Sequence, residues 1–180
     1  AQGIETNSGL DLRKPSTIPF LKRGFRAIIF GDLINRVANA TRPYEVEKGA
    51  TDKLKEEWIS RLEKEAPTMN DRAYKKAIKE IVEDFDNLPV KDIKIPKAGI
   101  VGEILVKFLP EANNNLQKVL EAEGAEVILP DLTDFFMYCM KNSELKADLY
   151  GKSKMSATVG KIGINIVEQY RKPVRKALSE

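Results

Sequence analysis

The stretch of residues 97–132, KAGIVGEILVKFLPEANNNLQKVLEAEGAEVILPDL, most constrains what this chain can fold into. Its two apolar runs, residues 98–106 and 125–129, are each followed by a proline, Pro110 and Pro130. Such runs are typical of parallel strands that are buried on both faces. A strand, a crossover helix and a second strand of this size predict a right-handed βαβ unit.

The predicted crossover helix has recognisable ends. Asn113, Asn114 and Asn115 crowd its start, where amide side chains can cap free backbone N–H groups. Gly124 stands where a helix commonly ends in the left-handed conformation. The sequence therefore predicts a capped helix between the two strands.

The rest of the chain reads as helices after an irregular lead-in at residues 1–18. Apolar residues at helical spacing predict helices over residues 20–39, 53–65, 71–88, 131–141 and 154–178, each with an apolar stripe along one face. On the last helix the predicted stripe consists of Met155, Val159, Ile162, Ile166, Tyr170, Val174 and Leu178. Residues 142–152 read as a loop or a broken helix, and Gly160 and Gly163 would let another helix approach the last one closely. We thus expect a helical segment over residues 19–90 and an α/β segment with a long C-terminal helix over residues 91–180.

The predicted fold class is α/β, helix-rich, with a short parallel sheet. Two strands make a poor sheet, because a hydrophobic parallel pair needs neighbouring strands. Either further strands are hidden, with residues 92–95 as a candidate, or the sheet partners lie outside these 180 residues. We favour the second reading, a truncated domain, and the first residue, Ala1, fits an internal fragment.

Cysteine and histidine usage excludes several chemistries. The chain has one cysteine, Cys139, and no histidine, so neither an intrachain disulfide nor a zinc site of the usual Cys/His type can form. A Ser-His-Asp triad is excluded for the same reason. Cys139 lies in DFFMYCM, which favours a small buried apolar side chain over a metal ligand.

The charge distribution argues against a nucleic-acid partner. The chain carries 30 basic and 27 acidic side chains, a net charge of +3, with basic clusters near both ends. These clusters can bind phosphates, but solvated helix faces are the commoner explanation. Aromatic residues are not interleaved with them as single-stranded nucleic acid binding requires. No apolar run approaches the ~18 residues of a membrane helix, so no membrane partner is expected either.

Five residues are candidates for substrate binding: Gly102, Glu103, Asn113, Arg42 and Glu45. Gly102 and Glu103 belong to GIVGE, which lacks the three glycines of a dinucleotide fingerprint. Glu103 is either a site carboxylate or a strand-edge residue paired with Lys107 or a backbone amide, because a lone buried carboxylate is costly. Asn113 is either a helix cap or a ligand contact. Arg42 and Glu45 of RPYE either present a surface guanidinium to a ligand or end a helix with a local ion pair.

The segment GIVGEILVKFLPEANNNLQKVLEAEGAEVILPDLTDFFMYC resembles the 2-hydroxyacyl-CoA dehydratase superfamily. It is most similar to activators of (R)-2-hydroxyglutaryl-CoA dehydratase, the CoA-substrate-specific enzyme activases. The upstream GDLINRVANATRPYEVEKGATD and the ending YRKPVRKAL fit the same proteins, so the resemblance spans residues 19–178.

This resemblance implies a cytoplasmic, dehydratase-like module of an ATP-dependent iron–sulfur activator, the electron donor for 2-hydroxyacyl-CoA dehydration in anaerobic metabolism. Its partners would be the rest of the parent chain and a 2-hydroxyacyl-CoA dehydratase or similar acceptor. An iron–sulfur cluster normally takes several cysteine thiolates, so no cofactor is expected within this segment. Cluster and ATP would belong to the parent protein, and the segment alone is not expected to be catalytic.

Two other functions remain open from the sequence. One is a non-catalytic interaction module that docks partner domains through apolar helices. The other is a stand-alone acyl-CoA-binding α/β domain. An apolar face left uncovered by missing strands would also favour a homo-oligomer.

Overall fold

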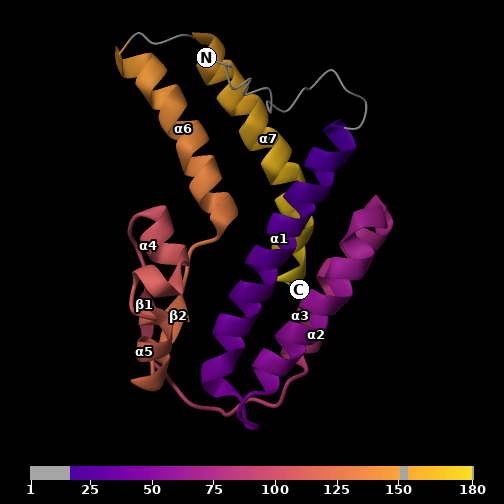
Figure 1. Cartoon of the computed structure of the whole chain (residues 1–180), viewed down its shortest axis with the longest axis vertical. Helices are drawn as coiled ribbons and strands as arrows, with labels where there is room; N and C mark the ends of the chain where they lie inside the picture. Colours follow the sequence, from indigo (N-terminus) through magenta and orange to yellow (C-terminus); the bar gives the residue numbers. More distant parts are fainter. Residues whose placement is uncertain (1–16, 151–153, 180) are drawn as a thin grey trace, which may run out of the picture.

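The computed structural model describes residues 17–150 and 154–179. The predicted lead-in at residues 1–18 lies outside this part, apart from Thr17 and Ile18, which open the first helix. The described chain is helix-rich with a two-stranded parallel sheet, which confirms the predicted α/β class. Figure 1 shows the small α/β unit on one side of helix α1 and helices α2 and α3 on the other.

Five long helices carry most of the chain. They are α1 (Thr17–Thr41), α2 (Ala50–Glu65), α3 (Asp71–Asp86), α6 (Leu132–Tyr150) and α7 (Lys154–Ala177). The strands are β1 (Lys97–Gly99) and β2 (Glu126–Ile128), with the short helices α4 (Ile104–Phe108) and α5 (Leu116–Ala122) between them. Single 3-10 turns lie at η1 (Arg42–Tyr44), η2 (Ala66–Thr68) and η3 (Pro110–Ala112), and each contains a proline near its start.

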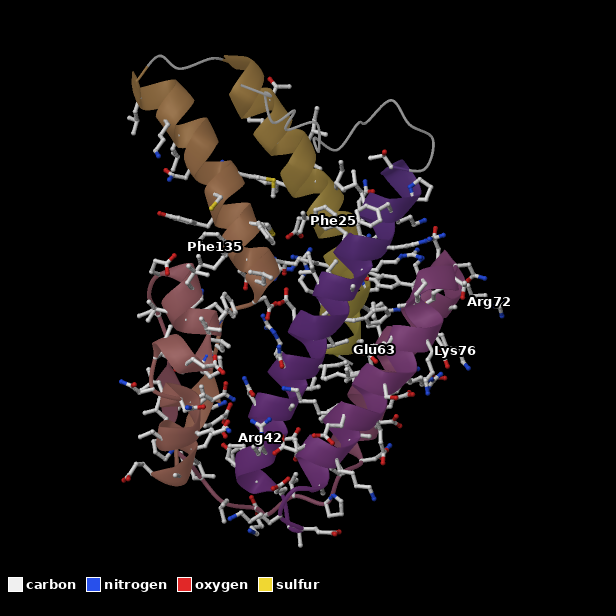
Figure 2. All side chains as sticks on the ribbon, in the orientation of Figure 1. Phe25, Arg42, Glu63, Arg72, Lys76 and Phe135 are labelled. Carbon is white, nitrogen blue, oxygen red and sulfur yellow. The ribbon has the colours of Figure 1, made fainter. Side chains whose placement is uncertain are left out.

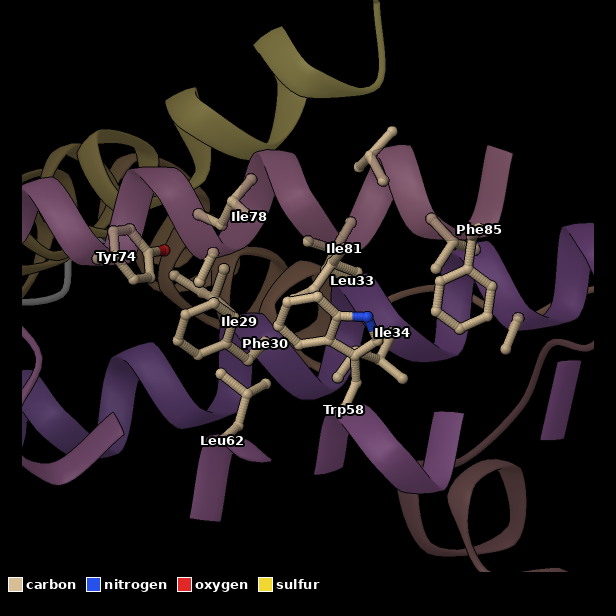
Figure 3. Close-up of a cluster of buried hydrophobic side chains, with 14 residues drawn as sticks. Ile29, Phe30, Leu33, Ile34, Trp58, Leu62, Tyr74, Ile78, Ile81 and Phe85 are labelled. Carbon is tan, nitrogen blue, oxygen red and sulfur yellow. The ribbon is translucent and has the colours of Figure 1, made fainter. Parts of the chain in front are cut away.

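The main apolar core lies between α1, α2 and α3 (Figure 3). Its largest fully buried side chains are Phe85, Leu33, Ile78 and Ile81, and each such burial contributes about 1.5–3 kcal/mol. The predicted stripes of these helices therefore face one another. The C-terminal half of α7 joins the core where the Tyr74 hydroxyl donates a hydrogen bond of 2.9 Å to the carbonyl of Tyr170.

Local signals in the sequence set the helix boundaries in this half. Asn70 is the N-cap of α3, and its Oδ1 accepts from the backbone N–H of Ala73 at 2.8 Å. The α1 helix ends at Thr41, two residues before Pro43, because a residue that precedes proline is disfavoured in helical geometry.

The parallel strand pair forms where it was predicted, but β1 is much shorter than the predicted run. Ala98 lies opposite Val127 in the parallel register, whereas residues 104–108 form helix α4 instead of continuing the strand. Gly102 has a positive φ of 148°, and the Glu103 carboxylate then caps the amides of α4. The predicted strand over residues 98–106 is therefore wrong beyond Gly99, because a glycine turn and a side-chain cap outweigh the apolar pattern.

Residues 92–95 do not form the additional strand that the sequence suggested. They have no regular structure, and the nearby Val90 makes only an isolated antiparallel bridge with Glu45. Within the described ranges the sheet therefore has two strands. The predicted crossover helix is present as α5, and Gly124 has a φ of 85° at its end.

Helices α6 and α7 lie side by side, as Figure 1 shows above the α/β unit. Residues 142–152 were expected to form a loop or a broken helix, and neither is seen over residues 142–150, because α6 continues to Tyr150 through a segment free of glycine and proline. Residues 151–153 lie outside the described residues. Gly160 and Gly163 do allow a close approach: a Cβ at Gly163 would lie 2.5 Å from Sδ of Met140 on α6.

Two predictions about side chains in this pair are wrong. Cys139 was expected to be buried but is exposed on α6. On α7 the predicted stripe included Ile162 and Ile166, which are exposed, while Val167 is buried. The predicted stripe residues Met155 and Val159 lie outside the side chains that the structure describes.

Candidate functional site

A basic cleft of about 630 Å³ lies between the helical half and the α/β unit. Its cationic side chains come from both walls: Arg42, Lys48 and Lys55 from the helical half, and Lys107 and Lys118 from the α/β unit. The only carboxylates among its lining residues are Asp52 and Glu121. In Figure 2 the Arg42 side chain lies at the lower end of α1, between the α2 and α3 pair and the α/β unit.

The cleft adjoins the carboxyl ends of the two parallel strands. Ile100 follows β1 and Leu129 follows β2, and both residues line the cleft. In open α/β sheets this edge is where ligands commonly bind, because the loops that leave the strands meet there. The basic cleft therefore has the position of a ligand site for this class of fold.

Arg42 connects the two walls of the cleft. Its Nε donates to Oδ1 of Asp52 at 2.9 Å, and its Nη1 donates to Oε1 of Glu121 on α5 at 2.8 Å. The amide of Gln117 bridges from α5 to Asn39 at 2.8 Å and to Glu121 at 2.9 Å. Since the Arg42 side chain is only 16% exposed and is held by two carboxylates, it positions the walls rather than reaching for a ligand.

The lysines supply the positive charge that remains once Arg42 is paired. Lys55 donates to Oδ1 of Asn35 at 2.8 Å, and burial together with the neighbouring Arg42 lowers the pKa of its ammonium group. The Lys107 ammonium lies 4.6 Å from the ring centroid of Phe108. Both acids of the lining are occupied by Arg42, so the cleft favours an anionic ligand.

Only two of the five predicted site residues, Arg42 and Asn113, line this cleft. Asn113 is bonded at both ends of its amide: Nδ2 donates to the carbonyl of Val106 at 2.7 Å, and Oδ1 accepts from Leu116 N–H at 3.1 Å. Its Oδ1 thus accepts from the first residue of α5, in line with the helix-cap reading, while the N-cap position itself is Asn115, whose side chain makes no cap hydrogen bond.

Gly102 and Glu103 lie outside the lining and shape the start of α4. The Glu103 carboxylate accepts from the backbone N–H groups of Leu105 at 2.7 Å and Val106 at 3.2 Å. Glu103 was expected to be either a site carboxylate or a strand-edge residue paired with Lys107 or a backbone amide. In the structure its carboxylate is paired with backbone amides, but at the start of a helix and not at a strand edge. Gly102 supplies the positive φ that the preceding turn requires.

Glu45 is buried and organises the loop before α2. Its carboxylate accepts from Gly49 N–H at 2.6 Å and from Thr51 N–H at 2.9 Å. Burial raises the pKa of Glu45, but the amide hydrogen bonds outweigh it, so the pKa lies below its ordinary value. Within RPYE, Arg42 therefore connects the two walls of the cleft, and Glu45 holds the loop before α2.

The sequence analysis missed the lysines of the cleft. Lys48 and Lys55 precede the strands by some fifty residues, and Lys107 and Lys118 lie on two short helices. Nothing in their spacing shows that they converge, since the convergence depends on the packing of α5 against the end of α1. The only available signal was the position of Lys107, directly after the predicted strand over residues 98–106.

The described residues hold no group of histidine, cysteine or acidic side chains that fits a metal ion. The whole sequence has one cysteine, so the residues present do not fit an iron–sulfur cluster. Across residues 17–150 and 154–179, no helix combines the length and apolar character that crossing a bilayer requires.

No protein family, curated protein or solved structure matches the chain.

Proposed function

We propose that this chain is a dehydratase-like module of an ATP-dependent iron–sulfur activator for 2-hydroxyacyl-CoA dehydration, and that it binds an acyl-CoA-type ligand in the basic cleft. The observation that carries the proposal is the set of cationic side chains from both walls at the carboxyl edge of the parallel strands. Coenzyme A esters present a diphosphate and a ribose phosphate, which such a cleft complements.

Residues of the segment that resembles the dehydratase superfamily also line the basic cleft. The segment that resembles the dehydratase superfamily forms one wall of the cleft, through α4, α5 and the residues after both strands. The RPYE stretch, which also fits these proteins, supplies Arg42 to the other wall. In this proposal the chain contributes binding, while the cluster and the ATPase belong to other parts of a parent protein.

A ligand-binding experiment on the whole chain tests the proposal. We expect acetyl-CoA to raise the melting temperature at millimolar concentration, because a ligand that binds only the folded state stabilises it. Pantetheine, which lacks the phosphates, is the matched ligand and should have a much smaller effect. The Lys107→Ala, Lys118→Ala double variant should lose most of the acetyl-CoA shift.

The control variant is Lys53→Ala, Lys64→Ala, which removes two exposed lysines of α2 that do not line the cleft. It should keep the acetyl-CoA shift. No stabilisation by millimolar acetyl-CoA, an equal shift with pantetheine, or an equal loss in the control variant would each contradict binding in the cleft.

A second function, a non-catalytic interaction module, is favoured by exposed apolar residues on the α/β unit. Val101 is 85% exposed and Leu105 is 68% exposed, and Val119 on α5 is 52% exposed. Exposed apolar groups that cluster on one unit commonly mark contact surfaces. If this unit docks on itself, Leu105→Glu should abolish concentration-dependent sedimentation of the chain, whereas sedimentation as a monomer at all concentrations would count against self-association.

A further inference from the structure

A second basic groove lies between α3 and α7, and it shares no lining residue with the cleft described above. Its volume is about 780 Å³. Five of its lining residues are cationic: Lys75 and Lys79 from α3, and Lys172, Arg175 and Lys176 from α7. No carboxylate is among the residues that line it.

The groove has an apolar floor and charged margins. Pro173 and Ala177 line it from α7, and both are partly buried. Lys75 and Lys79 are four residues apart on α3, and Lys172 and Lys176 are four apart on α7, so each margin presents cations one helical turn apart. This arrangement complements an elongated ligand with an apolar stripe and acidic flanks.

A cavity next to the groove already holds a carboxylate of the chain itself. A smaller adjoining cavity of about 200 Å³ shares Lys75, Gln169 and Pro173 with the groove. There Asp71 accepts from Lys22 at 2.7 Å and from the guanidinium of Arg26.

Arg26 lines this cavity from α1 and is only 4% exposed. Its Nη1 donates to the carbonyl of Met69 at 2.6 Å, and its guanidinium lies 4.8 Å from the centre of the Tyr74 ring. These contacts hold the guanidinium in place for its pairing with Asp71.

We propose that the groove between α3 and α7 binds an acidic, amphipathic protein segment, with its acidic side chains on the lysine margins and its apolar stripe on Pro173 and Ala177. An amphipathic helix in a groove is a recurring mode of recognition. Carboxylates on such a segment would pair with the lysines of both margins, as Asp71 pairs with Lys22 and Arg26 in the adjoining cavity. Nucleic acid fits less well, because no aromatic side chain lines the groove for base stacking.

Fluorescence anisotropy with the full chain tests this proposal. The probe is a labelled 14-residue synthetic helix with glutamates on both flanks and leucines at i, i+3, i+4 and i+7. We expect saturable binding that weakens as salt is raised, since exposed charge pairs are screened. A matched peptide with lysine in place of every glutamate should not bind.

The variant Lys75→Gln, Lys79→Gln, Lys172→Gln removes three cations of the groove and should weaken probe binding about tenfold or more. The control Lys53→Gln, Lys64→Gln, Lys94→Gln removes the same charge from exposed lysines outside the groove and should change binding less than about threefold. Circular dichroism melts verify that both variants fold. Reversing the groove charges with Lys75→Glu, Lys79→Glu, Lys172→Glu should let the lysine peptide bind instead.

Three outcomes would overturn the proposal. They are no saturable binding of the acidic peptide, equal weakening in the groove and control variants, and failure of the charge-reversed groove to accept the lysine peptide. Tighter binding of a single-stranded oligonucleotide than of the peptide, lost in the groove variant, would replace the protein segment with a nucleic acid and would also overturn it.

Discussion

Asp32 of α1 holds the start of α6 through three hydrogen bonds. Its Oδ1 accepts from Leu132 N–H at 2.9 Å, and its Oδ2 accepts from Thr133 N–H at 2.9 Å and from the Thr133 hydroxyl at 2.7 Å. One carboxylate thus caps the start of a helix 100 residues further along the chain. We predict that Asp32→Ala lowers the free energy of unfolding by about 2–3 kcal/mol.

This magnitude follows from the groups that the substitution leaves without partners. Loss of a helix N-cap typically costs about 0.5–2 kcal/mol, and a hydrogen bond to a charged acceptor contributes about 1.5–3 kcal/mol. The three bonds share one carboxylate and are not additive, so the estimate lies within these ranges. Asp32→Asn keeps one acceptor oxygen and should cost about 1 kcal/mol.

The pH dependence of the same contact gives an independent check. Burial raises the pKa of Asp32 above 3.8, against the lowering effect of the hydrogen bonds from Thr133 and Leu132. Because the pKa is higher in the folded state, folding favours the protonated form, and this residue's contribution to stability rises as the pH falls through the folded pKa. The stability of the wild type relative to Asp32→Asn should therefore increase on acidification and level off below about pH 3.8.

Urea unfolding followed by circular dichroism measures both the free energy lost in Asp32→Ala and the pH dependence of the difference between wild type and Asp32→Asn. Asp92→Ala is the matched control, because Asp92 is exposed in the segment before β1 and its side chain forms no hydrogen bond or ion pair with any described residue. It should change stability by less than about 0.5 kcal/mol. If Asp32→Ala costs no more than this control, or if the difference between wild type and Asp32→Asn shrinks on acidification, the account of the cap is refuted.

Three further predictions follow from single contacts. The pKa of Glu45 is lowered in the folded state, so its ionised carboxylate stabilises the fold above about pH 4.5, and this contribution is lost as the pH falls through the folded pKa. The free energies of unfolding of Glu45→Gln and wild type, measured in urea, should therefore differ at neutral pH and converge in acid. Gly160→Ala should destabilise by about 1–3 kcal/mol, because its Cβ would lie 3.0 Å from the backbone carbonyl oxygen of Met140, which cannot swing aside as a side chain can. Gly24→Ala should instead raise the melting temperature, since no described atom lies within 4 Å of a Cβ there and alanine favours the helix by about 0.5–1 kcal/mol. Maleimide should label exposed Cys139 in the native protein within about tenfold of the rate in denaturant, and a native rate hundreds of times slower would show that the thiol is buried.

The helices predicted over residues 20–39, 53–65 and 71–88 were found because their positions depend on local signals. The spacing of Tyr74, Ile78, Ile81 and Phe85 fixes the buried face of α3, and Asn70 caps it three residues before Ala73. The parallel pairing of residues around Ala98 and Val127 was likewise predictable, since a glycine-ended helix separates two apolar runs. In each case the deciding interactions lie within a few residues of the pattern.

The errors come from competing interactions that the apolar pattern does not record. ILVKF reads as strand by composition, yet Gly102 and the Glu103 cap turn it into α4. Cys139 lies among aromatic residues in the sequence, but which face of α6 is buried depends on where α7 packs. The cleft lysines were missed for the same reason, because four separate segments bring them together only through tertiary contacts.

The cleft lies at a joint that several polar contacts cross. The main apolar core includes no residue from the α/β unit, while Arg42 with Glu121 and Tyr44 with Glu126, at 2.7 Å, connect the unit to the end of α1. Tyr44 and Lys97 both bond the Glu126 carboxylate, which is buried at the first residue of β2. An anion bound between Lys55 on one wall and Lys107 and Lys118 on the other would add contacts across this joint. Ligand binding should therefore raise the stability of the α/β unit relative to the helical core, and amide hydrogen exchange should slow in β1 and β2 more than in α3.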